Sequence, residues 1–215
     1  MRSEKTMLKR HAPATERNRA PILTVLEAEL PLDGTVVEIA SGTGEHAAYF
    51  APRLPGRAWQ PTDLDAENLA SINAWREETQ CPQLLSAQVL DASDTQWPEH
   101  LPAYDSPVSA IVCINMVHIS PWTSCEGLLA GAEQLLPNGG VLYLYGPFMR
   151  GGEHTAPSNA AFDQQLKQRN PQWGLRNLES VLALAEAHQL TCRRVVEMPA
   201  NNLSVVLEKL ARLND

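Results

Sequence analysis

A short turn of small residues, Ser41-Gly42-Thr43-Gly44, separates two stretches with different patterns. Residues 36–40 before it are apolar apart from one acid and predict a buried strand, and residues 45–50 begin a helical pattern. A strand, a glycine-containing turn and a helix in this order form the nucleotide site of open α/β sheets. The third glycine of a dinucleotide turn is replaced here by Ala47. The turn therefore indicates a nucleotide site without saying which nucleotide binds.

Acidic residues stand near the ends of the first three predicted strands, at Glu38, Asp63 and Asp91. A carboxylate buried in a strand, like that of Glu38, is costly to desolvate unless a cation or a hydrogen-bond donor meets it. It would repel a phosphate and favour an ammonium or sulfonium group. Asp63, with Leu64 beside it, is placed to accept hydrogen bonds from two ribose hydroxyls, and Asp91 to accept one from the amino group of adenine. The alternative is that Asp63 and Asp65 only cap the following helix.

Further polar side chains follow the two most central predicted strands. Residues 108–115 are the most apolar run of the chain, and Asn115 and His118 stand at its end. Residues 141–145 end at Tyr145 and lead to a polar loop that contains His154. Because the carboxyl ends of parallel strands form the floor of the ligand crevice, His118, His154 and Tyr145 are candidates for acid–base or substrate-positioning roles. A packing role is the alternative for His118.

Strand and helix patterns alternate along most of the chain. Residues 13–30 predict a helical region, in which Pro21 leaves open whether 13–20 form a separate turn. Asp65 is the expected N-cap of the predicted helix 67–78. The final two strands are joined by a short turn and are expected to pair antiparallel. We predict an α/β fold with a seven-stranded, mostly parallel sheet. The predicted strands are 35–40, 58–62, 84–90, 108–115, 141–145, 190–197 and 203–207, and the predicted helices 44–54, 67–78, 123–136, 160–169 and 178–188.

Composition and charge limit the classes of function. The 215 residues include 44% hydrophobic and 20% charged residues, as in a globular protein, and no apolar run is long enough for a membrane helix. The net charge of −8 disfavours a nucleic-acid partner, although residues 1–19 carry six basic and two acidic side chains. Residues 1–12 are expected to form a flexible basic tail and residues 13–215 one domain. The histidines are scattered, so we expect no metal site. The four cysteines are also scattered, so we expect no disulfide and a reducing, cytoplasmic location. The oligomeric state is left open.

The acids and the turn together resemble a known motif series. Residues 38–44, Asp63, Asp91 and the strand that ends at Asn115 resemble the motifs of class I S-adenosylmethionine-dependent methyltransferases. More closely, the chain is similar to the methyltransferase-like 26 family, a domain of unknown function. The resemblance implies a Rossmann-like class I methyltransferase fold with helices on both faces, and S-adenosylmethionine as cofactor. The matching stretches are 13–18, 38–44, 59–65, 113–122, 144–148, 154–163 and 199–204.

The resemblance also implies roles for individual residues. The turn 41–44 would lie along the methionine part of the cofactor, with Glu38 near its amino group, Asp63 on the ribose and Asp91 on the adenine. Arg17 and Asn18 would close over the site from the amino-terminal arm. The alternatives are a protein that binds the cofactor without methyl transfer, and an NAD-dependent oxidoreductase, which the missing third glycine and the final hairpin disfavour. The resemblance does not indicate the substrate. A small molecule is expected instead from the aromatic residues near the polar loop, which could line a pocket for it: Trp122, Trp173, Tyr145, Phe148 and Phe162. The expected cofactor-binding residues are Arg17, Asn18, Glu38, Ser41, Gly42, Gly44, Asp63, Leu64, Asp91 and Asn115.

Overall fold

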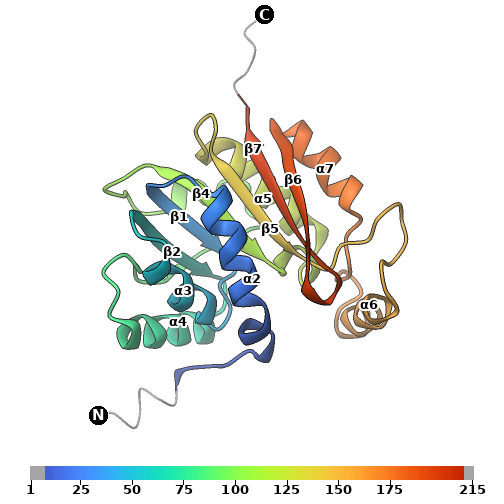
Figure 1. Cartoon of the computed structure of the whole chain (residues 1–215), viewed down its shortest axis with the longest axis horizontal. Coiled ribbons are helices and arrows are strands. Elements are labelled where there is room, and N and C mark those ends of the chain that lie inside the picture. Colours follow the sequence, from blue (N-terminus) through green and yellow to red (C-terminus); the bar gives the residue numbers. More distant parts are fainter. Residues whose placement is uncertain (1–7, 211–215) are drawn as a thin grey trace, which may run out of the picture.

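A twisted sheet of seven strands runs through the centre of the molecule (Figure 1). The structure is a computed structural model and describes residues 8–210. The strand order is β3-β2-β1-β4-β5-β7-β6. β1 to β5 pair parallel, whereas β7 runs antiparallel to both β5 and β6. The predicted α/β fold with an antiparallel carboxyl-terminal hairpin is therefore confirmed. The strands are β1 (Gly34–Ile39), β2 (Arg57–Asp63), β3 (Gln88–Val89), β4 (Val108–Ile114), β5 (Val141–Gly146), β6 (Leu190–Met198) and β7 (Asn202–Lys209).

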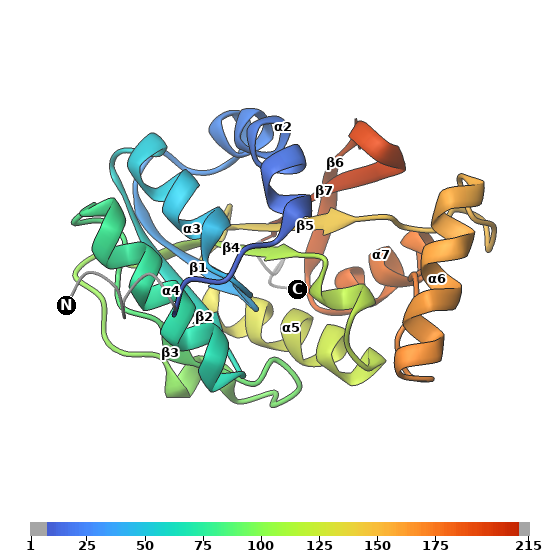
Figure 2. The same ribbon diagram turned by 90° about the horizontal axis from the view of Figure 1, so that it is seen from below.

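Helices cover both faces of the sheet, because alternate residues of each strand point to opposite sides. Val37 and Ile39 of β1 pack into the core beneath α5 and α7, whereas Val36 packs into the core beneath α2 and α3. Figure 2 shows α2 and α3 on one side of the sheet and α5 on the other. Glu38 lies two residues after Val36 and therefore shares the α2 side. The helices are α2 (Pro13–Glu29), α3 (Glu45–Phe50), α4 (Ala66–Thr79), α5 (Trp122–Leu135), α6 (Pro157–Arg169) and α7 (Leu178–Ala187).

The order of the strands places a crevice between β1 and β4. From β1 the chain continues outward to β2 and β3, and it then returns to β4 on the other side of β1. The loops that leave β1 and β4 consequently diverge, which is where open α/β sheets bind ligands. The glycine-containing turn and the segment after Ile114 both lie at this point.

The predicted strand 84–90 is only partly formed, and the prediction of its length was wrong. Only β3 pairs regularly with β2, and a single bridge joins Leu84 to Trp59. Between Leu84 and β3, side chains take the place of strand partners. Gln60 donates to the carbonyl of Ser86, and Asn73 accepts from the amide of Ala87. The first contact comes from β2 and the second from α4, and local periodicity reports neither.

The amino-terminal segment lies against the body of the protein from residue 9 onward. Pro21 lies inside α2 without ending it, so 13–20 are not a separate turn. Arg10 donates its amide to Ser71 of α4, and Ala12 donates its amide to Glu45 at the start of α3. A flexible tail was expected for residues 1–12. Residues 1–7 lie outside the described residues, and Arg10 and Ala12 make the contacts just given. None of the helices within 8–210 combines the length and apolar character needed to cross a bilayer.

Candidate functional site

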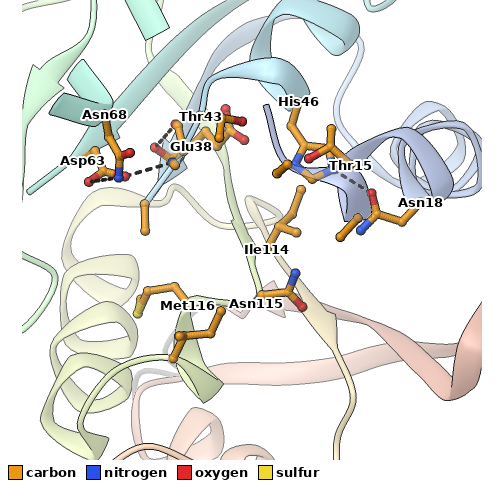
Figure 3. A pocket seen from close by; sticks show the side chains of 16 residues that line it. Thr15, Asn18, Glu38, Thr43, His46, Asp63, Asn68, Ile114, Asn115 and Met116 are labelled. Atoms are coloured by element: carbon orange, nitrogen blue, oxygen red, sulfur yellow. Dashed lines mark hydrogen bonds between the residues drawn. The ribbon is translucent and has the colours of Figure 1, made fainter. Parts of the chain in front are cut away.

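A cavity of about 460 Å³ opens at the crevice between β1 and β4 (Figure 3). Its walls come from the start of α2, the turn after β1, the end of β2, the first turn of α4 and the segment after β4. Its size is that of a small-molecule or cofactor site. The lining residues are Ala12, Ala14, Thr15, Asn18, Glu38, Ala40, Ser41, Gly42, Thr43, His46, Asp63, Asn68, Ile114, Asn115, Met116 and Ile119.

The turn after β1 is held in a left-handed backbone conformation at three positions. Ala40, Gly42 and Gly44 have φ values of 55°, 59° and 87°. A Cβ atom on Gly44 would lie 2.7 Å from the Cα of Ile72, whereas a Cβ atom on Gly42 would meet no atom within 4 Å. Gly44 thus allows the turn to pack on α4, and Gly42 leaves backbone open to the cavity. Alanine tolerates this region at a cost of about 1–2 kcal/mol, so Ala40 is a point of local strain beside the cavity.

The carboxylate of Glu38 is buried in the cavity wall. Its residue is 1% exposed, and the indole Nε1 of Trp59 donates to its Oε2 over 2.9 Å. No lysine, arginine or histidine among the described residues forms an ion pair with it. Burial raises the pKa of Glu38 to about 7, with the hydrogen bond from Trp59 opposing that rise. A positively charged ligand group at this position would restore the charged form.

Asp63 joins the turn to α4 across the cavity. Its Oδ2 accepts from the amide of Gly42 over 2.8 Å, and its Oδ1 accepts from the amide of Asp65 and from the side-chain amide of Asn68. Asp65 accepts from the amide of Glu67 and caps α4, as predicted. A carboxylate has about four lone-pair positions, so Asp63, which lines the cavity, keeps one acceptor position on Oδ2 without a protein donor among the described residues.

Four of the ten residues expected to bind a cofactor lie outside the cavity wall. Leu64 is 62% exposed, and Arg17 is exposed on α2. Asp91 is exposed, and its Oδ1 accepts from both the amide and the hydroxyl of Ser93. Gly44 supports the turn from behind and is also not part of the wall. The expected residues that the fold does bring together in the wall are Asn18, Glu38, Ser41, Gly42, Asp63 and Asn115.

The start of α2 contributes contacts that the sequence did not indicate. The side-chain oxygen of Asn18 lies 2.8 Å from His46 Nε2, and its amide hydrogen-bonds the hydroxyl of Tyr145. Burial lowers the pKa of His46 to about 4, so its ring is neutral and can donate to Asn18. Thr15 and Asn68 also face the cavity (Figure 3). Asn18 and Tyr145 were expected from the sequence; of Thr15, His46 and Asn68, only His46 carried a signal, since it stands two residues after the glycine turn.

None of the three expected acid–base residues lines the cavity. Tyr145 is buried at the end of β5 behind Asn18, and burial raises the pKa of its hydroxyl. Nε2 of His154 lies 3.5 Å from Asp163 in the loop and helix after β5. His118 is fully buried against Phe148, and its Nε2 has no hydrogen-bond partner among the described residues. Within 8–210, no three His, Cys, Asp or Glu side chains are grouped so as to hold a metal ion.

His118 is expected to remain a neutral imidazole over the whole range in which enzymes usually work. Burial and the nearby Arg176 lower its pKa to about 3, and the amide of Arg176 donates to its Nδ1 over 3.2 Å. The proton of the neutral ring therefore stays on Nε2. Histidine NMR spectra recorded between pH 4 and 8 should show one ring in this tautomer that does not titrate. A value near 6.5 for His118, assigned with a His118→Gln variant, would contradict the buried geometry.

Comparison with solved structures identifies the fold as the Rossmann-like fold of class I methyltransferases. An O-methyltransferase family 2 protein from Planctomyces limnophilus, solved with apigenin, has a TM-score of 0.72 and 19% identity over 90% of this chain and 56% of that chain. Human N-acetylserotonin methyltransferase, solved with S-adenosylmethionine, has a TM-score of 0.71 and 12% identity over 92% of this chain and 53% of that chain. Geranyl diphosphate C-methyltransferase from Streptomyces coelicolor, solved with S-adenosylhomocysteine, has a TM-score of 0.68 and 12% identity over 89% of this chain and 78% of that chain.

The chain spans little more than half the length of the first two proteins. It belongs to the family described as "Protein of unknown function (DUF938)", which it matches over residues 9–209.

Proposed function

We propose that this protein is an S-adenosylmethionine-dependent methyltransferase that acts on a small molecule. The observation that carries the proposal is the buried carboxylate of Glu38, which faces the cavity without a cationic partner among the described residues. S-adenosylmethionine carries an ammonium and a sulfonium group, and either would balance this charge. A dinucleotide would instead place its pyrophosphate at the turn, between the carboxylates of Glu38 and Asp63, where the charges repel.

The residues of the cavity fit the cofactor part by part. Gly42 leaves the backbone of the turn accessible, so that the methionine portion can lie along it. Glu38 would accept from the amino group of that portion. The remaining acceptor position on Asp63 Oδ2 would receive one ribose hydroxyl, which is one fewer than the two expected from the sequence. Leu64 and Asp91, which follow β2 and β3 directly or by one residue, remain proposed contacts of the adenosine.

Methyl transfer requires mainly the alignment of the acceptor with the donor. When bound, S-adenosylmethionine supplies a methyl group on sulfur that an acceptor atom can attack in line. Asn115 and Ile119 form the wall on the β4 side, where an acceptor would approach. His118, His154 and Tyr145 are proposed to act from behind this wall. The neutral ring of His118 suits positioning better than proton removal, because its Nδ1 lone pair is already used by Arg176.

Replacing Asp63 with alanine is expected to weaken the binding of S-adenosylhomocysteine. One charge-assisted hydrogen bond contributes about 1.5–3 kcal/mol, so calorimetry should show a dissociation constant higher by about 10- to 150-fold. Thermal unfolding must be measured beside it, because Asp63 also fixes Gly42 and Asn68. The exposed acid Glu99 provides a matched control, and Glu99→Ala should leave affinity unchanged. Unchanged affinity in the folded Asp63→Ala variant would remove the ribose assignment.

Two alternatives are distinguished by simple experiments. A thermal-shift comparison should show stabilisation by S-adenosylhomocysteine and none by NAD; the reverse result would favour an oxidoreductase. Transfer of a labelled methyl group into extracts of small metabolites, but not into protein or RNA fractions, would support the proposed substrate class. Binding without transfer into any fraction would favour a protein that only binds the cofactor.

The narrower resemblance to the methyltransferase-like 26 family and a cytoplasmic location remain part of this proposal. The proposal includes no nucleic-acid partner. The net charge of −8 supports that choice, because phosphate backbones bind to basic surfaces.

A further inference from the structure

A second cavity, of about 500 Å³, lies beside the turn formed by residues 116–120, since its lining residue Arg176 donates to the carbonyls of Val117 and Ser120. It is bounded by the start of α5, the end of α6, the loop 171–177 and the start of α7. It shares no lining residue with the cavity at the glycine turn. Met116 and Ile119 line the first cavity, whereas Trp122, just beyond the same turn, lines the second. The two cavities are therefore separate sites with a common wall.

The apolar part of the second cavity is dominated by two indole rings. Trp122 and Trp173 both line it and are only half-buried, and Met149 and Leu175 add apolar surface. Large flat side chains that remain partly exposed around a concavity are typical of sites for planar ligands. The shape and chemistry of these walls favour an aromatic ring system.

The polar part of the cavity carries positive charge and no carboxylate. Lys167 and Arg176 line it, and no Asp or Glu does. Lys167 is paired with Asp163 over 2.6 Å. Arg176 forms no ion pair among the described residues; its Nε and Nη2 donate to the carbonyls of Val117, Ser120 and Gln172, and no described acceptor meets its Nη1. The local balance of Lys167, Asp163 and Arg176 is one positive charge.

We propose that this second cavity binds a small aromatic carboxylate. A ring packed against the indoles would place a carboxylate toward Arg176, whose Cζ lies 5.7 Å from the centroid of the Trp122 ring and whose planar guanidinium matches that group. The single net positive charge suits a monoanion better than a phosphate dianion. Because Arg176 also holds the carbonyls of Val117 and Ser120, an occupant would stiffen the wall shared with the first cavity. The proposal stands independently of methyl transfer.

The test uses the full-length protein and 2-naphthoate as the probe, followed by calorimetry and by NMR of the tryptophan indole N–H groups. We expect saturable one-to-one binding, with the signals of Trp122 and Trp173 shifting most among the five tryptophans. The neutral analogue 2-naphthamide should bind at least about tenfold more weakly, since it loses the charge-assisted contact. Saturating S-adenosylhomocysteine should not displace the probe.

Matched variants locate the site. Trp173→Ala should weaken naphthoate binding by about tenfold or more, because one wall of the cavity is removed. Lys167→Gln, which keeps a hydrogen bond to Asp163, should weaken it by about threefold or more. Trp75→Phe changes another half-buried tryptophan that lines neither cavity, and it should have no effect. Equal binding of naphthoate and naphthamide, unchanged binding by folded Trp173→Ala, or displacement by S-adenosylhomocysteine would each overturn the proposal.

Discussion

Replacing Glu38 with glutamine is expected to weaken the binding of S-adenosylhomocysteine by about 100-fold, or about 3 kcal/mol. The substitution preserves the size of the side chain and an oxygen that can accept from Trp59, and it removes the negative charge. The ammonium group of the ligand would then be desolvated without a charged partner. Calorimetry at pH 8, where the carboxylate is ionised, gives the largest difference between the two proteins. A change below about threefold would show that Glu38 does not face a cation.

The same substitution should stabilise the protein without ligand at high pH. The folded-state pKa of Glu38 is raised from 4.5 to about 7 by burial, so the unfolded chain ionises first as pH increases. The stability that the protonated group contributes is fully present below pH 4.5 and is lost as pH rises through 7. The loss approaches about 3 kcal/mol above pH 8, and Glu38→Gln should not show it.

Denaturant unfolding at pH 5 and pH 8 measures this difference directly. Wild-type protein should lose stability between the two values relative to Glu38→Gln, and the two proteins should be closest at pH 5. Ligand binding should show the complementary trend, with the affinity of wild type increasing toward pH 8 because the carboxylate must ionise to meet a cation. If Glu38→Gln is equally destabilised at both values, loss of packing rather than charge is responsible.

The two glycines of the turn should separate folding from binding when each is replaced by alanine. Gly44→Ala places a Cβ atom 2.7 Å from the backbone of Ile72 and also strains a φ of +87°, so we expect a loss of about 3 kcal/mol or more in unfolding free energy. Gly42→Ala meets no protein atom within 4 Å. It should cost only about 1 kcal/mol from its left-handed φ, but should weaken S-adenosylhomocysteine at least about tenfold because the methyl group enters the cavity.

Thermal unfolding and calorimetry on the two variants provide the comparison. Gly44→Ala should show the larger fall in melting temperature. Gly42→Ala should unfold close to wild type and yet bind poorly. If Gly42→Ala binds as well as wild type, the ligand does not approach the turn, and the assignment of the methionine portion to this backbone would fail.

Local patterns predicted most of the fold, because strands of a parallel sheet are nearly continuous apolar runs and the helices follow periodic patterns. The strand 84–90 was wrong in extent, since Gln60 and Asn73 occupy its backbone groups from other elements. The residues of the candidate site also divide into those that local sequence indicates and those that it does not. Glu38, most of the turn and Asp63 do lie in the cavity wall, and they were recognisable because strand ends and glycine turns can be located from adjacent sequence. Thr15 and Asn68 were not, because only the docking of α2 and α4 brings them to the cavity.

The contact between Glu45 and the segment before α2 has a consequence for kinetics. Glu45 lies outside the cavity wall, yet it accepts from the amide of Ala12 and from His11, and Ala12 begins the part of the chain that forms one side of the cavity. If that side yields when a ligand departs, these contacts set the residence time of the ligand more than its equilibrium affinity. Glu45 also accepts from the hydroxyl of Thr43 in the cavity wall. A substitution at Glu45 would then be found mainly in stopped-flow dissociation rates, while the proposed ligand contacts of Glu38 and Asp63 stay in place.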